Sequence, residues 1–244
     1  IRDSNIGLED NMALPQTEHP LIDVHIHSLN KSVKFRPFLV KEEKLLVLAN
    51  ETKDQDEMIR ATQQVVTNCS FGKVQGDELP IFDMQKIFLE LRKVSVSDSV
   101  EVRLLCGHCE APIDIQIELD TFKLHETEGH AMDFQIAEDI SVKMRYPNAK
   151  ELTALGQSET EGDIYKVAES CIETVFYGDA IIEFNELKEE ERSDFIDNLT
   201  SEQFAHIKNF FESMPVIENH VEYKCNKCEK DNVAYLNGYY DFFG

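Results

Sequence analysis

Two short cysteine motifs constrain the fold of this chain more than any other feature of its sequence. C-G-H-C runs from Cys106 to Cys109, and C-N-K-C runs from Cys225 to Cys228, each in a turn between extended runs. Two thiolates at this spacing bind one cation, and two such pairs supply the four sulfur ligands of a closed, structural Zn²⁺ site. We therefore predict one structural zinc ion with four ligands: Cys106, Cys109, Cys225 and Cys228.

The motifs are separated by residues 110–224, which is far more chain than a compact zinc ribbon contains. After the first motif, Ile113, Ile115 and Ile117 alternate with polar residues, as in a half-buried strand. We therefore expect one zinc ribbon that is split into two β-hairpin knuckles, with most of a domain inserted between them. A thioredoxin-like redox motif would instead place a C-x-x-C pair at the start of a helix, and neither pair has that context.

Apolar residues at helical spacing predict much of the remaining structure. The clearest stripes run from Met58 to Cys69 and from Ile164 to Val175. Their cysteines, Cys69 and Cys171, are interpreted as core thiols rather than metal ligands. Two further helix starts are predicted by capping boxes, Thr52 with Gln55 and Thr200 with Gln203.

The predicted fold class is α+β, with an N-terminal helical bundle, a split zinc ribbon and a helical insertion. The chain divides into four predicted parts. These are an extended N-terminal arm (residues 1–20), a strand and helical N-terminal region (21–98), the split ribbon with an aromatic C-terminal tail (99–120 with 220–244), and a mainly helical insertion (121–219).

The sequence D-V-H-I-H suggests a minor alternative, a metal-dependent hydrolase that uses His25 and His27. An H-x-H pair on a strand places both imidazoles on one face, but such an enzyme also needs a β/α barrel with further ligands at later strand ends. The chain lacks repeated strand–helix units, and its other histidines do not follow a matching order. We therefore expect a strand with a polar face here, and no enzymatic activity.

The net charge of the chain limits the classes of molecule that it is expected to bind. The chain has 24 Lys and Arg against 47 Asp and Glu, a net charge of −23. This balance argues against binding to nucleic acid, which needs clustered basic residues, and against binding to an anionic membrane surface. No apolar run approaches the roughly 18 residues of a membrane span. Protein partners are expected instead.

The chain ends in an aromatic segment, N-G-Y-Y-D-F-F-G. Aromatic side chains at a chain end rarely stay exposed in a monomer. They either fold back onto the core or bind in a groove of a neighbouring protein. The candidate partner-binding residues are Tyr239, Tyr240, Phe242 and Phe243.

Several of these stretches together resemble a known family. They are K-F-R-P-F-L-V-K-E-E-K-L-L, which starts at Lys34, L-P-I-F-D-M-Q-K-I-F-L-E-L-R, which starts at Leu79, the two C-x-x-C pairs and the terminal G-Y-Y-D-F-F. This set is similar to the T-even-type phage baseplate hub and hub-assembly proteins. The similarity covers most of the chain from Lys34 onward and is strongest over residues 34–94.

The resemblance implies a non-enzymatic role in the tail baseplate of a contractile phage. It implies other baseplate and tail proteins as partners, several copies per baseplate, and a location in the virion tail after assembly in the host cytoplasm. Two roles stay open at this point. The protein is either a structural part of the hub or its surroundings, or a transient assembly chaperone that is absent from the mature virion.

Overall fold

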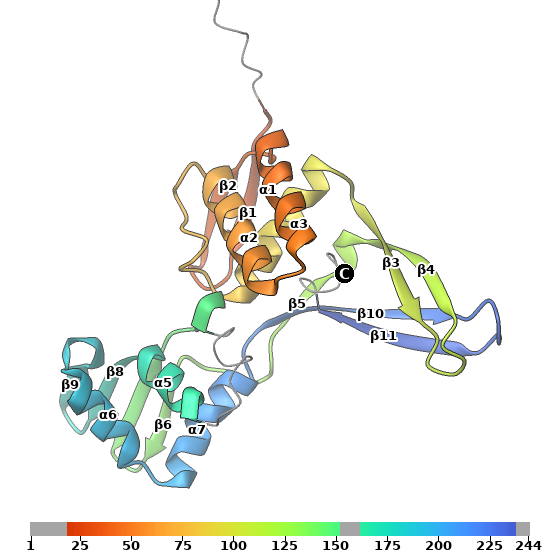
Figure 1. Cartoon of the computed structure of the whole chain (residues 1–244). Coiled ribbons are helices and arrows are strands. Elements are labelled where there is room, and N and C mark those ends of the chain that lie inside the picture. Colours follow the sequence, from red (N-terminus) through yellow and green to blue (C-terminus); the bar gives the residue numbers. More distant parts are fainter. Residues whose placement is uncertain (1–18, 152–161, 238–244) are drawn as a thin grey trace, which may run out of the picture.

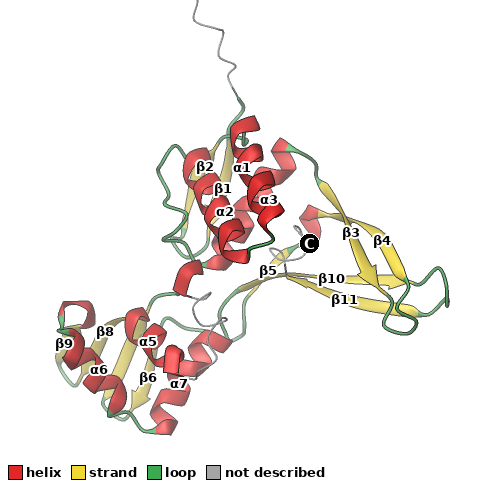
Figure 2. Ribbon diagram, in the orientation of Figure 1, coloured by secondary structure: helices red, strands yellow, loops and turns green. Residues whose placement is uncertain are grey.

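The computed structural model describes residues 19–151 and 162–237 (Figure 1, Figure 2). Within these ranges, helices alternate with four small antiparallel sheets, so the predicted mixture of α and β structure is confirmed. The predicted N-terminal arm, residues 1–20, lies almost entirely outside the described residues. So do the tail residues Tyr239, Tyr240, Phe242 and Phe243.

A two-stranded sheet covered by helices forms the first unit, residues 22–95. Alternation along the strands sends every second side chain into a core that the helices share. These inward residues are Val24, Ile26, Val33 and Phe35. The elements are β1 (Ile22–Ile26), β2 (Lys31–Phe35), α1 (Val40–Thr52), α2 (Gln55–Cys69) and α3 (Ile81–Ser95).

One predicted helix start is wrong and one is confirmed. Helix α2 is capped by Asp54, whose carboxylate accepts the backbone N–H groups of the second and third residues after it. Thr52 is the last residue of α1, and its hydroxyl donates back to the carbonyl of Ala49 at 2.7 Å. The box of Thr200 with Gln203 is present at the start of α7.

The second unit, residues 133–212, contains a four-stranded sheet in the order β6-β7-β8-β9 together with helices. The region predicted to be a mainly helical insertion, residues 121–219, thus holds this sheet beside its helices α5, α6 and α7. The stripe predicted to be helical as far as Val175 leaves the helix at Cys171, because the β-branched residues that follow favour a strand. The elements are β6 (Asp133–Ala137), β7 (Ile140–Met144), α5 (Gly162–Cys171), β8 (Ile172–Tyr177), β9 (Ala180–Glu183), α6 (Glu189–Asp197) and α7 (Ser201–Glu212).

Each unit leads into a long β-hairpin, and the two hairpins lie side by side at the right of Figure 1. Their apolar residues share a core with Phe82 and Leu89 of α3. A short strand, β5 (Lys123–His125), pairs with the second hairpin. The hairpin strands are β3 (Ser99–Leu105) with β4 (Pro112–Glu118), and β10 (Val216–Lys224) with β11 (Asp231–Asn237); two 3₁₀ turns are η1 (Leu119–Thr121) and η2 (Phe184–Glu186).

The two units follow one plan. Each begins with an antiparallel pair of strands, β1–β2 or β6–β7, in which an aspartate lies opposite a lysine. The pairs are Asp23 opposite Lys34 and Asp133 opposite Lys143. In each unit the last helix contacts the first strand, α3 on β1 and α7 on β6, and then leads into a hairpin that carries a C-x-x-C motif. The chain therefore contains two versions of one arrangement.

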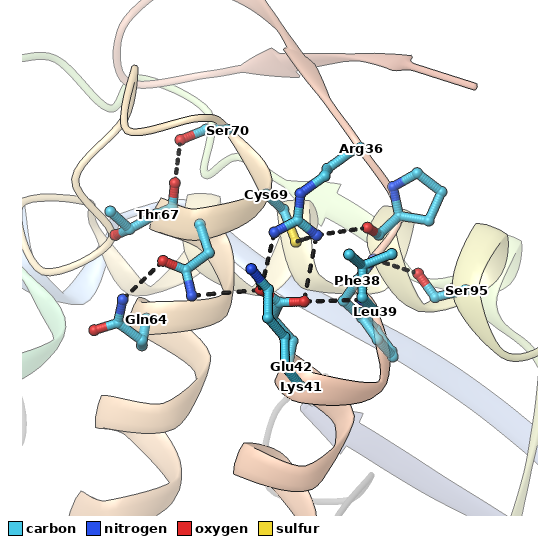
Figure 3. Close-up of polar contacts among 12 residues, drawn as sticks. Arg36, Phe38, Leu39, Lys41, Glu42, Gln64, Thr67, Cys69, Ser70 and Ser95 are labelled. Atoms are coloured by element: carbon cyan, nitrogen blue, oxygen red, sulfur yellow. Dashed lines mark hydrogen bonds and ion pairs between the residues drawn. The ribbon is translucent and has the colours of Figure 1, made fainter. Parts of the chain in front are cut away.

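An arginine–glutamate pair follows the strands of each unit. Arg36 donates to Glu42 at 2.9 and 3.3 Å, and Arg145 donates to Glu151 at 2.7 and 2.9 Å. Each glutamate also accepts the backbone N–H three residues before it at 2.9 Å, and each arginine donates to the carbonyl of the next residue. Figure 3 shows the first of these pairs. We call them the clamps.

In the first unit the clamp fixes the start of α1 relative to β2, and in the second it ties Arg145, just after β7, to the segment at Glu151. The Glu42 side chain is 1% exposed and Arg36 11%, whereas Glu151 is 20% and Arg145 35% exposed. Burial alone would raise the pKa of both glutamates, but the hydrogen bonds from the arginine and the backbone outweigh it and lower each pKa. Both carboxylates therefore stay ionised. The clamp of the first unit is less exposed to solvent than that of the second.

Candidate metal centre

Four sulfur atoms meet between the tips of the two hairpins. The Sγ atoms of Cys106, Cys109, Cys225 and Cys228 all lie within 4.8 Å of one another. Across the hairpins, Cys106 is 3.6 Å from Cys228, and Cys109 is 3.7 Å from Cys225. Sulfurs bound tetrahedrally to zinc at about 2.3 Å would be about 3.8 Å apart. The two separations across the hairpins are close to that value.

The two knuckles have the same backbone geometry. In each, the first cysteine donates its N–H to the carbonyl five residues later at 3.0 Å, and accepts at its carbonyl the N–H four residues later at 2.9 Å. The residue after the second cysteine, Glu110 or Glu229, has a φ of 57° or 58°. This left-handed residue turns the chain back into the hairpin, so both thiols of a pair face the same side.

Contacts between the hairpins position the knuckles against each other. Asn232 of the second hairpin accepts the N–H of Gly107 at 2.9 Å, and the Tyr223 hydroxyl donates to the carbonyl of Leu105 at 2.9 Å. Cys106 and Cys225 are each 1% exposed and pack with apolar neighbours. The site is therefore closed on its inner side, as expected for a structural rather than a catalytic centre.

The surroundings of the thiols favour thiolate at part of the set. Burial would raise the pKa of Cys106, but backbone N–H groups and neighbouring thiols donate to it and lower the pKa to about 6. Backbone N–H groups, with that of Cys228 foremost, also lower the pKa of Cys225. At Cys228 a backbone hydrogen bond acts to lower the pKa, but burial and the other three sulfurs raise it to about 12. The lowered pKa values favour the thiolate form of Cys106 and Cys225, whose negative charge a bound cation would neutralise.

The donor set defines the class of ion. Four sulfur donors in a tetrahedral arrangement select zinc, or iron in sulfur coordination, over the hard ions that prefer oxygen. All four donors are thiols free of disulfides, so each can act as a thiolate ligand. A four-coordinate ion held in this way has no open position for water or substrate.

The remaining candidate ligands lie elsewhere. His108, between the first two cysteines, is exposed, and it contributes a backbone N–H to the Cys106 sulfur at 3.4 Å. His25 is exposed on β1, which confirms a strand with a polar face, and the backbone N–H of His27 donates to Asp83. Among the described residues, neither His25 nor His27 belongs to a group of three or more potential metal ligands.

The other two cysteines are core thiols, as predicted. Cys69 and Cys171 are each fully buried, and burial raises the pKa of Cys69 to about 11 and that of Cys171 to about 12. Both stay protonated at neutral pH, and they lie in the apolar cores of the two units rather than at the hairpin tips.

Residues 19–244 match the family described as T4 bacteriophage base plate protein. The chain belongs to this family. The match spans both units and both hairpins of the baseplate protein, so it covers the whole described structure. No curated protein and no solved structure matches the chain. Within the described ranges, none of the helices of this baseplate protein is both long and apolar enough to cross a membrane.

Proposed function

We propose that this protein is a non-enzymatic structural component of a contractile phage tail, in the baseplate hub or directly beside it. The observation that carries the proposal is the family match over residues 19–244. The protein would be assembled in the host cytoplasm, occur in several copies per baseplate and remain in the virion tail. Its partners would be other baseplate proteins, because a net charge of −23 disfavours nucleic acid.

One Zn²⁺ ion on Cys106, Cys109, Cys225 and Cys228 would join the two hairpins. Each hairpin is the extension of one unit, so this single ion would fix the two units relative to each other. Structural zinc contributes about 10–16 kcal/mol of apparent binding free energy at pH 7. Closing a loop of roughly 100 residues costs about 5 kcal/mol in the chain-entropy model. The ion therefore outweighs the entropy of bringing the distant cysteine pairs together.

The first test is quantitative mass spectrometry of purified virions. A structural component is present at a fixed ratio to other baseplate proteins, at more than one copy per particle. Presence in assembling cells and absence from finished virions would reject the structural role, and would support a transient hub-assembly chaperone instead.

The second test is metal analysis of the purified full chain. Elemental analysis should give close to one zinc per chain for the wild type and for His108→Ala, which changes an exposed residue between two ligands. Cys106→Ser should bind far less zinc. Wild-type protein purified without added metal and free of zinc would contradict the zinc proposal while leaving the baseplate role intact.

A further inference from the structure

The two units differ in the path of the chain directly after α2 in the first unit and α5 in the second. In both, the backbone N–H of the clamp arginine donates to the carbonyl of the last residue of that helix: Arg36 to Cys69 at 3.0 Å, and Arg145 to Cys171 at 2.8 Å. Beyond Cys171 the chain continues as β8, which pairs antiparallel with β7 on the side opposite β6. The second unit therefore fills both edges of its second strand.

In the first unit the chain turns away at the same point. Phe71 and Gly72 have φ values of 59° and 71°, and the N–H groups of residues 70–72 bond to carbonyls within the end of α2. These left-handed residues fold the chain back along its own helix instead of extending it along β2. Among the described strands, β2 pairs with β1 alone.

The free side of β2 carries backbone groups ready for pairing. Backbone N–H groups alternate in direction along a strand. The N–H groups of Ser32 and Lys34 therefore point to the same side as the N–H of Arg36, away from β1. Both residues are exposed. The matching residues of the second unit, Ser141 and Lys143, lie opposite Phe176 and Thr174 of β8.

The burial of matching valine side chains also differs between the two units. Val33 of β2 is 9% exposed, whereas the matching Val142 of β7 is 0% exposed beside its partner Val175. The first unit has no strand in the place of β8 among its described residues. It is therefore slightly open at the position where β8 completes the second unit.

We propose that the outer edge of β2 accepts an extended segment of a partner protein, antiparallel to β2, in the position that β8 has beside β7. Addition of a strand to an exposed sheet edge is an established way of binding peptides, in which main-chain bonds give affinity and alternate side chains give specificity. The proposal concerns this edge alone and does not depend on the baseplate role.

The second unit indicates the chemistry of the segment. Lys143 of β7 forms an ion pair with Glu173 of β8 at 3.3 Å, and Lys34 of β2 has the position of Lys143. Lysine on an edge strand opposes unselective pairing. Here it would select a strand that carries an acidic residue beside β-branched and aromatic ones, as in I-E-T-V-F-Y of β8.

Hydrogen exchange on the isolated full chain tests whether the edge is open. The amides of Ser32 and Lys34 should exchange at least about tenfold faster than those of Ser141 and Lys143, which β8 covers. Equal protection of the two pairs would mean that the edge of β2 is already covered, and would overturn the proposal.

A synthetic peptide with the sequence of residues 172–179, I-E-T-V-F-Y-G-D, tests the binding itself. We expect saturable slowing of exchange at Ser32 and Lys34, and little change at β7, where the covalently attached β8 competes at high effective concentration. Ser32→Pro, which removes an outward N–H, should abolish the protection at Lys34, whereas Ser32→Thr should retain it.

A charge exchange tests the register. Lys34→Glu should weaken binding of this peptide about tenfold, and a peptide with lysine in place of its glutamate should restore it. Matching thermal midpoints of the variants would show that the unit stays folded. No protection of β2 at millimolar peptide, or equal binding by wild type and Ser32→Pro, would overturn the proposal.

Discussion

The two units share a plan, yet one is closed by its own chain and the other is not. The second unit adds β8 and β9 between α5 and α6, and its clamp is partly exposed, with Glu151 20% exposed. The first unit has a loop instead, and its clamp is buried, with Glu42 1% exposed. The comparison separates what both units share, namely the strand pair, the clamp and the C-x-x-C hairpin, from what only the second unit has.

The knuckles of the two hairpins, in contrast to the units, have nearly the same backbone geometry. Their knuckle hydrogen bonds have the same two lengths, 3.0 and 2.9 Å, and the left-handed residues differ by one degree in φ, 57° against 58°. The proposed shared ion would account for this difference, because four ligands must converge on one point and each hairpin supplies two. The two units supply none of the four cysteine ligands, so ligand geometry does not require them to be alike.

The largest expected effect comes from substituting a cysteine in either knuckle, which tests whether the two knuckles bind the proposed ion equally. Cys106→Ser and Cys225→Ser should lose zinc to the same extent and should unfold or aggregate, because zinc binding contributes about 10–16 kcal/mol. Elemental analysis and thermal unfolding measure both. If one hairpin variant kept a full zinc content while the other lost it, the two knuckles would not be equivalent ligands.

The clamps should differ in their contribution to stability. Removing one partner of a buried ion pair costs about 3–5 kcal/mol, and an exposed pair contributes about 1 kcal/mol or less. Glu42→Gln should therefore lower the free energy of unfolding by about 3 kcal/mol or more, and Glu151→Gln by about 1–2 kcal/mol. Urea unfolding measures the difference, with the exposed Glu51→Gln as the control. Equal losses would show that exposure does not distinguish the clamps.

A matched pair of proline variants tests the strand edges. Ser141→Pro removes an N–H that faces β8 and should cost about 1–3 kcal/mol, because a carbonyl of β8 loses its donor. Ser32→Pro removes an N–H that faces outward and should cost less than about 1 kcal/mol, since edge strands tolerate proline there. Thermal unfolding compares them. A larger loss for Ser32→Pro would refute the open edge.

Much of the candidate site was predictable from sequence, because spacing alone shows that two C-x-x-C turns between extended runs suit one ion. The end of the helix at Cys171 could not be predicted in the same way. The spacing of apolar residues alone does not distinguish a buried helix from a short buried strand such as the one that contains Val175. The repeat of the units was missed. Its signal is short: S-V-K-x-R occurs at residues 32–36 and 141–145, each followed six residues later by glutamate.

The smallest expected effect is the pH dependence of the clamps. The pKa of Glu42 is lower in the folded chain than the ordinary 4.5, so its contribution to stability is present above that value. It is lost as the pH falls through the folded pKa, because the unfolded chain then binds the proton first. The difference in unfolding free energy between wild type and Glu42→Gln should therefore shrink below about pH 4.5.

Urea unfolding at pH 7, 5, 4 and 3 measures that difference. Acid would also protonate the cysteine ligands and release the proposed zinc ion, but wild type and variant would share this loss, so it cancels in the comparison. The same series for Glu151→Gln should show a shallower change, since that carboxylate is more exposed. A difference that stays constant from pH 7 to 3 would mean that packing around residue 42, and not its charge, holds the first helix against the strand.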